Sequence, residues 1–183
     1  MTKQNIRNQI LNKRKNLTSK EALLLSNQVF TKLLPFLSHY NNFFIYHSFK
    51  NEVDTKQIIK FLLENNKNVF LPKIENGNMV AVKFNYNMQK NYYGIEEPCG
   101  EKIEIFNFVS IIPAIALDNQ GNRIGFGKGY YDKFLKNNPC LKIALCYDFQ
   151  LLKIIPFEKH DVKMDIIITP SKIIDCNLSL EKK

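Results

Sequence analysis

Three short segments of this chain are apolar on both faces, and they constrain the fold more than any other feature. They cover residues 108–112, 142–147 and 165–169. Strands buried on both faces are typical of parallel sheets, in which helices cover each face and connect the strands. The sequence therefore predicts an α/β fold, with a single three-layer α/β/α domain over residues 1–183 and a mostly parallel, Rossmann-like sheet.

The spacing of apolar residues elsewhere predicts the other elements. Helices are expected over residues 3–16, from Thr18 or Ser19 as N-cap to just before Pro35, and over residues 54–64. Strands are expected over residues 42–48, 68–72 and 79–84. Residues 85–100 are polar and rich in turn-forming residues, which predicts a long loop of the kind that often carries function.

Charge and cysteine content narrow the class of protein. The formal net charge is +9, but no block of like charges stands out, so an anionic small molecule explains it as well as a nucleic acid does. We therefore expect no nucleic-acid partner. Cys99, Cys140, Cys146 and Cys176 form no C-x-x-C pair, which favours reduced thiols over a disulfide framework or a zinc site.

The longest apolar run, residues 109–117, is interrupted by Pro113 and is far shorter than the roughly 18–20 residues that cross a bilayer. The basic N-terminal segment is rich in Lys and Asn, whereas organelle transit peptides are rich in Arg and Ser. We expect a cytoplasmic, monomeric protein without a membrane partner.

The most informative motif is glycine-rich. Residues 121–132 read G-N-R-I-G-F-G-K-G-Y-Y-D, and they hold four of the seven glycines of the chain. Alternating glycines allow backbone N–H groups to approach an anion, and the helix expected from Tyr130 would present its N-terminus to a phosphate. The motif fits neither the P-loop nor the dinucleotide pattern. A glycine-rich turn without a ligand is the alternative.

The string R-I-G-F-G-K-G-Y-Y-D resembles the signature loop of the 5-formyltetrahydrofolate cyclo-ligases, also called 5,10-methenyltetrahydrofolate synthetases. Weaker matches occur in the same order as in that family. They are K-Q-N-I-R at 3–7, E-V-D-T at 52–55, G-I-E-E-P at 94–98 and E-K-H-D-V-K-M-D-I-I-I-T at 158–169. The resemblance covers nearly the whole chain.

The resemblance implies an ATP- and Mg²⁺-dependent ligase that closes 5-formyltetrahydrofolate to 5,10-methenyltetrahydrofolate through a phosphorylated formyl oxygen. Arg123 and Lys128 would be catalytic, neutralising charge during phosphoryl transfer. Mg²⁺ would be held by Asp132 and Asp161, and the folate would contact His47, Glu52 and Tyr130. The implied ATP-binding residues are Lys3, Arg7, Arg123, Ile124, Gly125, Phe126, Gly127, Lys128, Gly129, Tyr130 and Tyr131.

The chain departs from the family pattern in having no Trp, which some relatives place near the pterin pocket. The candidate replacements for it are Phe49, Phe84, Tyr86, Tyr92 and Tyr93. Two other functions stay open on sequence alone. One is a basic RNA- or nucleotide-binding module without catalysis. The other is a sugar-phosphate isomerase or acyl transferase on a similar scaffold, because a fold does not determine a function.

Overall fold

The computed structural model describes residues 1–92 and 94–178. Its helices are α1 (Lys3–Lys15), α2 (Ser19–Leu37), α3 (Lys56–Glu64) and α4 (Tyr130–Asn137), with a short 3₁₀ turn, η1 (Asp148–Gln150). The strands of the main sheet are β1 (Asn42–Ile45), β2 (Asn68–Glu75), β3 (Asn78–Lys83), β6 (Lys102–Ile103), β7 (Phe108–Pro113), β10 (Leu141–Leu145), β12 (Ile166–Ile168) and β13 (Ile173–Asp175). The remaining strands are β4 (Met88–Lys90), β5 (Glu96–Pro98), β8 (Ala116–Asp118), β9 (Arg123–Ile124) and β11 (Leu151–Leu152).

In the described residues the main sheet has eight strands, in the order β13-β12-β10-β7-β1-β2-β3-β6. The five central strands, from β12 to β2, run parallel to one another. The outer strands pair antiparallel with their neighbours: β13 with β12, β3 with β2, and β6 with β3. The predicted α/β fold with a mostly parallel sheet is therefore confirmed.

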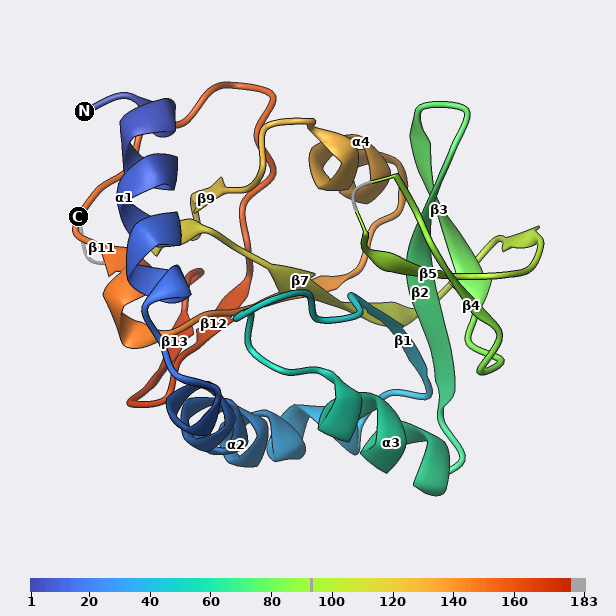
Figure 1. The fold of residues 1–183 in the computed structure, drawn as a ribbon. Helices are drawn as coiled ribbons and strands as arrows, with labels where there is room; N and C mark the ends of the chain where they lie inside the picture. Colours follow the sequence, from blue (N-terminus) through green and yellow to red (C-terminus); the bar gives the residue numbers. More distant parts are fainter. Residues whose placement is uncertain (93, 179–183) are drawn as a thin grey trace.

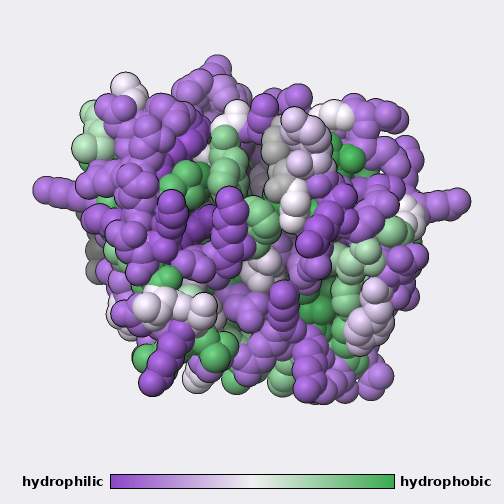
Figure 2. Space-filling model, viewed as in Figure 1, coloured by the Kyte–Doolittle hydropathy of each residue, from purple (hydrophilic) through white to green (hydrophobic). Residues whose placement is uncertain are grey.

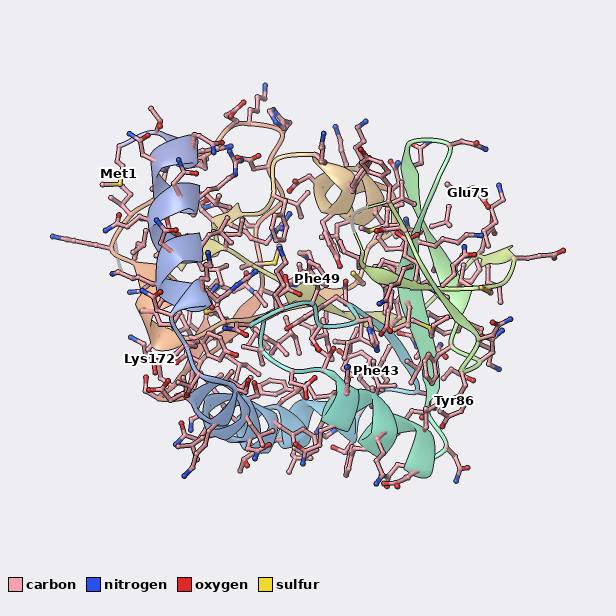
Figure 3. All side chains as sticks on the ribbon, in the orientation of Figure 1. Met1, Phe43, Phe49, Glu75, Tyr86 and Lys172 are labelled. Atoms are coloured by element: carbon pink, nitrogen blue, oxygen red, sulfur yellow. The ribbon has the colours of Figure 1, made fainter. Side chains whose placement is uncertain are left out.

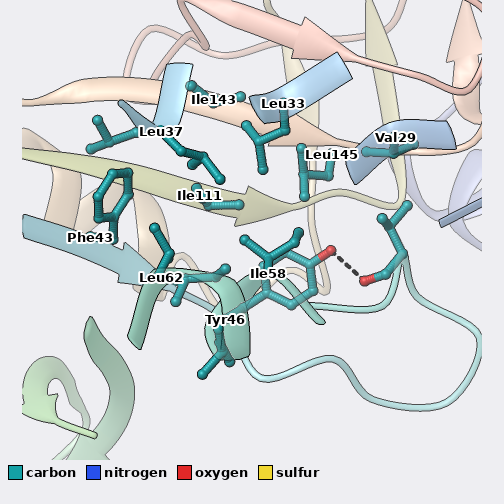
Figure 4. Close-up of a cluster of buried hydrophobic side chains, with 14 of the residues drawn as sticks. Val29, Leu33, Leu37, Phe43, Tyr46, Ile58, Leu62, Ile111, Ile143 and Leu145 are labelled. Atoms are coloured by element: carbon teal, nitrogen blue, oxygen red, sulfur yellow. Dashed lines mark hydrogen bonds between the residues drawn. The ribbon is translucent and has the colours of Figure 1, made fainter. Parts of the chain in front are cut away.

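Helices cover both faces of this sheet (Figure 1). On β1, Phe43 and Ile45 pack against α2 and α3, whereas Phe44 between them stacks on Phe134 of α4 with ring centroids 4.4 Å apart. The same alternation continues along the neighbouring strands, so each face of the sheet has its own apolar core. Figure 4 shows the core under α2 and α3, where the hydroxyl of Tyr46 donates a 2.8 Å hydrogen bond to the carbonyl of Val53.

Helix α1 packs beside the main sheet, on a small sheet of β11, β8 and β9 (Figure 1). Its buried residues Ile6 and Ile10 join Ile115, Ala116 and Ile124 in a third apolar cluster. The surface around these elements is mostly hydrophilic, with scattered apolar side chains between the charged ones (Figure 2). Among the described residues, no helix is both long and apolar enough to span a membrane.

Two sequence predictions are wrong. Helix α2 does not end before Pro35 but continues to Leu37. Proline lacks an N–H and forfeits a helical hydrogen bond, but Leu33 and Leu37 are fully buried on either side of it, and burying them stabilises the last turn. Residues 85–100 are not one loop either, because β4 and β5 pair antiparallel within them.

Candidate functional site

The connections of the central strands identify the topological switch point of the sheet. From β1 the chain passes through α3 to β2 on one side, and from β7 it passes through α4 to β10 on the other. The neighbours β1 and β7 thus lie where the strand order reverses, and in open α/β sheets ligands bind beyond the carboxyl ends of such strands. His47 and Glu52 follow β1, and the glycine-rich segment follows β7.

The glycine-rich segment runs from β9 into α4, and its conformation requires glycine. The φ angles of Gly127 and Gly129 are +92° and +68°, in the left-handed region that other residues rarely adopt. Gly129 is the N-cap of α4. Residues 125–129, between β9 and α4, form a short bend whose residues are exposed or half-exposed.

These glycines also make room for two guanidinium groups. A Cβ on Gly125 would lie 2.6 Å from Nη1 of Arg123, and a Cβ on Gly127 would lie 3.1 Å from Nη2 of Arg7. The Nε–H of Arg7 donates a 2.8 Å hydrogen bond to the carbonyl of Gly125. Two cations from distant parts of the chain therefore meet on this segment, where the absence of a glycine side chain leaves room for them.

Arg123 is almost completely buried at the start of this segment. Its Nη2 lies 3.3 Å from Oδ2 of Asp132, its Nη1 donates to the carbonyl of Pro113 at 3.4 Å, and its guanidinium lies 5.4 Å from the ring centroid of Tyr131. Its buried Nε–H has no hydrogen-bond partner among the described residues. Buried donors are rarely left unpaired, so this N–H is a polar group that the described part of the protein does not satisfy.

The two predicted metal ligands belong to segments that are tied together. The backbone N–H of Val162, the residue after Asp161, donates to Oδ1 of Asp132 at 3.2 Å. This bond ties the segment that carries Asp161 to α4, which carries Asp132. Oδ2 of Asp161 accepts hydrogen bonds from Nζ of Lys3 at 2.6 Å and from the N–H of Glu158 at 2.7 Å. Burial alone would raise the pKa of Asp161, but these bonds outweigh it and lower the pKa.

Asp132 and Asp161 suit Mg²⁺, which takes one or two carboxylates and fills its other positions with phosphate oxygens and water. The described part of the chain has no cluster of three or more His, Cys, Asp or Glu residues that could hold a metal ion alone.

Glu52 lies in the turn between β1 and α3 and is 8% exposed. Its Oε2 accepts a 3.0 Å hydrogen bond from the N–H of Phe49, and its Oε1 lies 3.7 Å from Nη1 of Arg14. Burial raises the pKa of Glu52, and Arg14 and the Phe49 N–H offset part of this effect. Burial raises the pKa of the Tyr131 phenol, and the nearby charge of Glu52 raises it further.

His47 pairs with the strand β5, at 3.3 Å from its Nδ1 to Oε2 of Glu96. Burial lowers the pKa of His47, although Glu96 acts in the opposite direction. Ile124 is buried against α1, and its carbonyl accepts a 2.8 Å hydrogen bond from the N–H of Ile115. Lys128 is exposed and Tyr130 is half-exposed at the mouth of the site.

The aromatic candidates for the pterin pocket separate by position. Phe49, labelled near the centre of Figure 3, directly precedes the Glu52 turn. Phe84 packs against the core, whereas Tyr86 and Tyr92 are 78% and 97% exposed. Tyr93 lies outside the described residues. Phe49 is thus the candidate that lies beside a predicted folate contact.

Sequence reasoning missed Arg14. Its signal was present, because Arg14 continues the i, i+4 spacing of Ile6 and Ile10 and therefore places a cation on the apolar face of α1. It also missed Glu96 as the partner of His47, since that pairing joins a strand end to a hairpin almost fifty residues away and no local pattern predicts it.

Comparisons with known proteins place the chain in a family. The 5-formyltetrahydrofolate cyclo-ligase family model matches residues 1–170. A 5-formyltetrahydrofolate cyclo-ligase of Haemophilus influenzae is 30% identical over 184 residues, covering 91% of this chain and 97% of that protein. A probable 5-formyltetrahydrofolate cyclo-ligase of Schizosaccharomyces pombe is 30% identical over 147 residues, covering 68% of this chain and 72% of that protein.

Solved structures give the same result. The structure of the Aquifex aeolicus 5,10-methenyltetrahydrofolate synthetase matches with a TM-score of 0.85 and 31% identity, covering 96% of this chain and 93% of that one. The Mycoplasma pneumoniae 5,10-methenyltetrahydrofolate synthetase matches with a TM-score of 0.76 and 28% identity, covering 93% of this chain and 99% of that one. The chain therefore belongs to the 5-formyltetrahydrofolate cyclo-ligase family of enzymes.

Proposed function

We propose that this enzyme closes the ring of 5-formyltetrahydrofolate to 5,10-methenyltetrahydrofolate with ATP and Mg²⁺, releasing ADP and phosphate. The observation that supports it most strongly is the meeting of Arg7 and Arg123 on the glycine-rich segment, with an unpaired buried N–H on Arg123. Lys3 and Lys128 add positive charge, and Asp132 and Asp161 supply two carboxylates. A nucleoside triphosphate with a divalent ion matches this set of charges.

The proposed chemistry has two steps. The formyl oxygen attacks the γ-phosphorus of ATP, the bond from that phosphorus to the bridging oxygen breaks, and ADP leaves. N10 of the folate then attacks the activated formyl carbon, loses its proton and expels the phosphate together with the formyl oxygen. The protein supplies no nucleophile, and its contribution is to position the two substrates and stabilise charge.

Each charged residue has a defined part in this proposal. Lys3 and Arg7, which lie one turn apart on α1, bind the nucleotide, and Arg123 and Lys128 stabilise the charge that moves onto the phosphate oxygens. Asp132 and Asp161 would hold Mg²⁺, which when bound neutralises phosphate charge. Because Lys3 pairs with Asp161 and Arg123 pairs with Asp132, the same two carboxylates orient the cations.

Glu52, His47 and Tyr130 bind the folate in this proposal. A buried carboxylate accepts hydrogen bonds from the amino and ring N–H groups of a pterin. The phenols of Tyr46 and Tyr131 near Glu52 are neutral at physiological pH, and burial raises their pKa values further above it. We further propose a cytoplasmic monomer, and the free thiols of all four cysteines support a reducing compartment.

The activity is tested by following the absorbance of the methenyl product with purified protein. Product should form only when ATP and Mg²⁺ are both present. Lys128→Ala should reduce turnover strongly, whereas Lys133→Ala, an exposed cation on α4, should not. Formation of product without ATP, or equal rates for both variants, would contradict the proposal.

The phosphorylated intermediate has a separate test. With ¹⁸O in the formyl group of the substrate, the isotope should be recovered in inorganic phosphate. Recovery of the isotope in water alone would exclude phosphorylation of the formyl oxygen, without affecting the assignment of the overall reaction.

A further inference from the structure

Arg14 is a buried cation that the proposed reaction does not yet use. It lies on the inner face of α1, one helical turn beyond Ile10, and is 4% exposed. A buried guanidinium is costly unless it is paired, so its partners indicate its role. The charged partner is Glu52, with side-chain exposures of 5% and 7% for the two residues.

The contacts of Arg14 join three segments around the proposed site. Its guanidinium lies 5.9 Å from the ring centroid of Phe126, which belongs to the glycine-rich segment. Its backbone carbonyl accepts a 3.0 Å hydrogen bond from Nδ2 of Asn51, next to Glu52 in the chain, and the carbonyl of Leu17 accepts a second one at 2.9 Å. The end of α1 therefore holds the Glu52 turn against the glycine-rich segment.

The groups that face Glu52 come from several elements. Arg14 of α1 and the N–H of Phe49 favour the ionised carboxylate, and burial opposes it. The phenols of Tyr46, Tyr131 and Tyr147 lie near it and are neutral at physiological pH, and burial and the Glu52 charge both raise their pKa values. Removing the Arg14 charge would leave the carboxylate with one backbone donor in a largely apolar environment, which favours the protonated acid.

We propose that Arg14 is a positioning residue, which keeps Glu52 ionised and orients it to accept hydrogen bonds from the folate. Through Phe126 it also links this carboxylate to the segment that binds the phosphates. The inference rests on the proposed folate-binding role of Glu52.

The test uses Arg14→Gln, Arg14→Lys and Glu52→Gln, with Lys15→Gln as a control because Lys15 is an exposed neighbour on α1. The kcat and the KM values for folate and ATP are measured across the neutral pH range. The titration of the Glu52 carboxyl is followed separately by ¹³C NMR, with its signal assigned by its loss in Glu52→Gln. This second measurement does not depend on enzyme activity.

Arg14→Gln should raise the folate KM roughly tenfold to a hundredfold, because a charged hydrogen-bond acceptor is lost when Glu52 is protonated. The KM for ATP should change much less. The Glu52 titration and the acid limb of kcat/KM for folate should both move up by about one pH unit or more. Arg14→Lys should restore most of both, and Lys15→Gln should behave as the wild type.

A double variant separates positioning from general structural support. In the Glu52→Gln background, Arg14→Gln should add no further loss of folate affinity. The double variant buries two neutral side chains, so it avoids the unpaired buried charge that could prevent Arg14→Gln alone from folding. An additional loss would overturn the inference, as would an Arg14→Gln variant that loses folate affinity while its Glu52 titration stays where it is in the wild type. An unchanged folate KM in Glu52→Gln would instead overturn the proposed role of Glu52 itself.

Discussion

Substituting Gly127 tests whether the glycine-rich segment is built to admit Arg7. In Gly127→Ala the new Cβ meets the Arg7 guanidinium at 3.1–3.2 Å, and the residue keeps a φ of +92°. The left-handed backbone costs about 1–2 kcal/mol for a residue other than glycine. If Arg7 moves and loses its hydrogen bond to Gly125, the loss of this charged bond costs about 1.5–3 kcal/mol more.

Gly77→Ala is the matched control. Gly77 lies in the turn between β2 and β3 with a φ of +75°, and a Cβ there meets nothing within 4 Å. It should therefore show the backbone cost of about 1–2 kcal/mol without any effect on Arg7. The two free energies of unfolding are compared by urea denaturation.

The ATP dependence of turnover then separates strain from function. Gly127→Ala should raise the KM for ATP roughly tenfold to a hundredfold, which corresponds to the energy of the Arg7 interaction. Gly77→Ala should leave that KM unchanged. The reasoning is refuted if Gly127→Ala unfolds at the same urea concentration as Gly77→Ala and binds ATP as the wild type does.

Three further outcomes are expected. Leu33→Ala should lower the free energy of unfolding by about 2–5 kcal/mol, because the side chain is fully buried under the sheet. Leu24→Ala on the same helix, where the residue is 59% exposed, should change it by less than about 0.5 kcal/mol. Urea unfolding measures both, and equal losses would contradict the core assignment. Asp132→Asn keeps an acceptor for the Val162 N–H but removes the negative charge, so the Mg²⁺ concentration that gives half the maximal rate should rise about tenfold or more. An unchanged Mg²⁺ requirement would reject Asp132 as a ligand. Burial lowers the pKa of His47 in the folded protein below 6.5, so its contribution to stability is complete above that pH and is lost as the pH falls through the folded pKa. The free energy of unfolding should therefore depend less on pH in His47→Gln than in the wild type across this window. An identical pH dependence in the two proteins would show that His47 is not the group responsible.

The central strands could be predicted from sequence because their burial on both faces leaves a continuous apolar run. The ends of elements were harder. β1 ends at Ile45 rather than Ser48, since the chain turns away there and the hydroxyl of Thr55 bonds the carbonyl of Tyr46 and accepts from the N–H of Ser48. The β4–β5 hairpin was missed because its strands are three residues each and carry polar side chains.

The proposed site shows the same division. Local pattern was sufficient to single out the glycine-rich segment, but not to show that Arg7 reaches Gly125 across 118 positions of sequence. The family resemblance supplied Lys3 and Asp161 separately, and the structure adds that they are ion partners. The Arg14–Glu52 pair depends on tertiary packing, and its only sequence signal is a charge on an apolar helix face.

A structure of the enzyme with Mg²⁺, a non-hydrolysable ATP analogue and 5-formyltetrahydrofolate tests the central claim most directly. We expect the phosphates against residues 125–129 and the guanidinium groups of Arg7 and Arg123, with the ion on Asp132 and Asp161 and the pterin on Glu52. Phosphates bound elsewhere, with Arg7 and Arg123 still occupied only by the protein, would contradict the account.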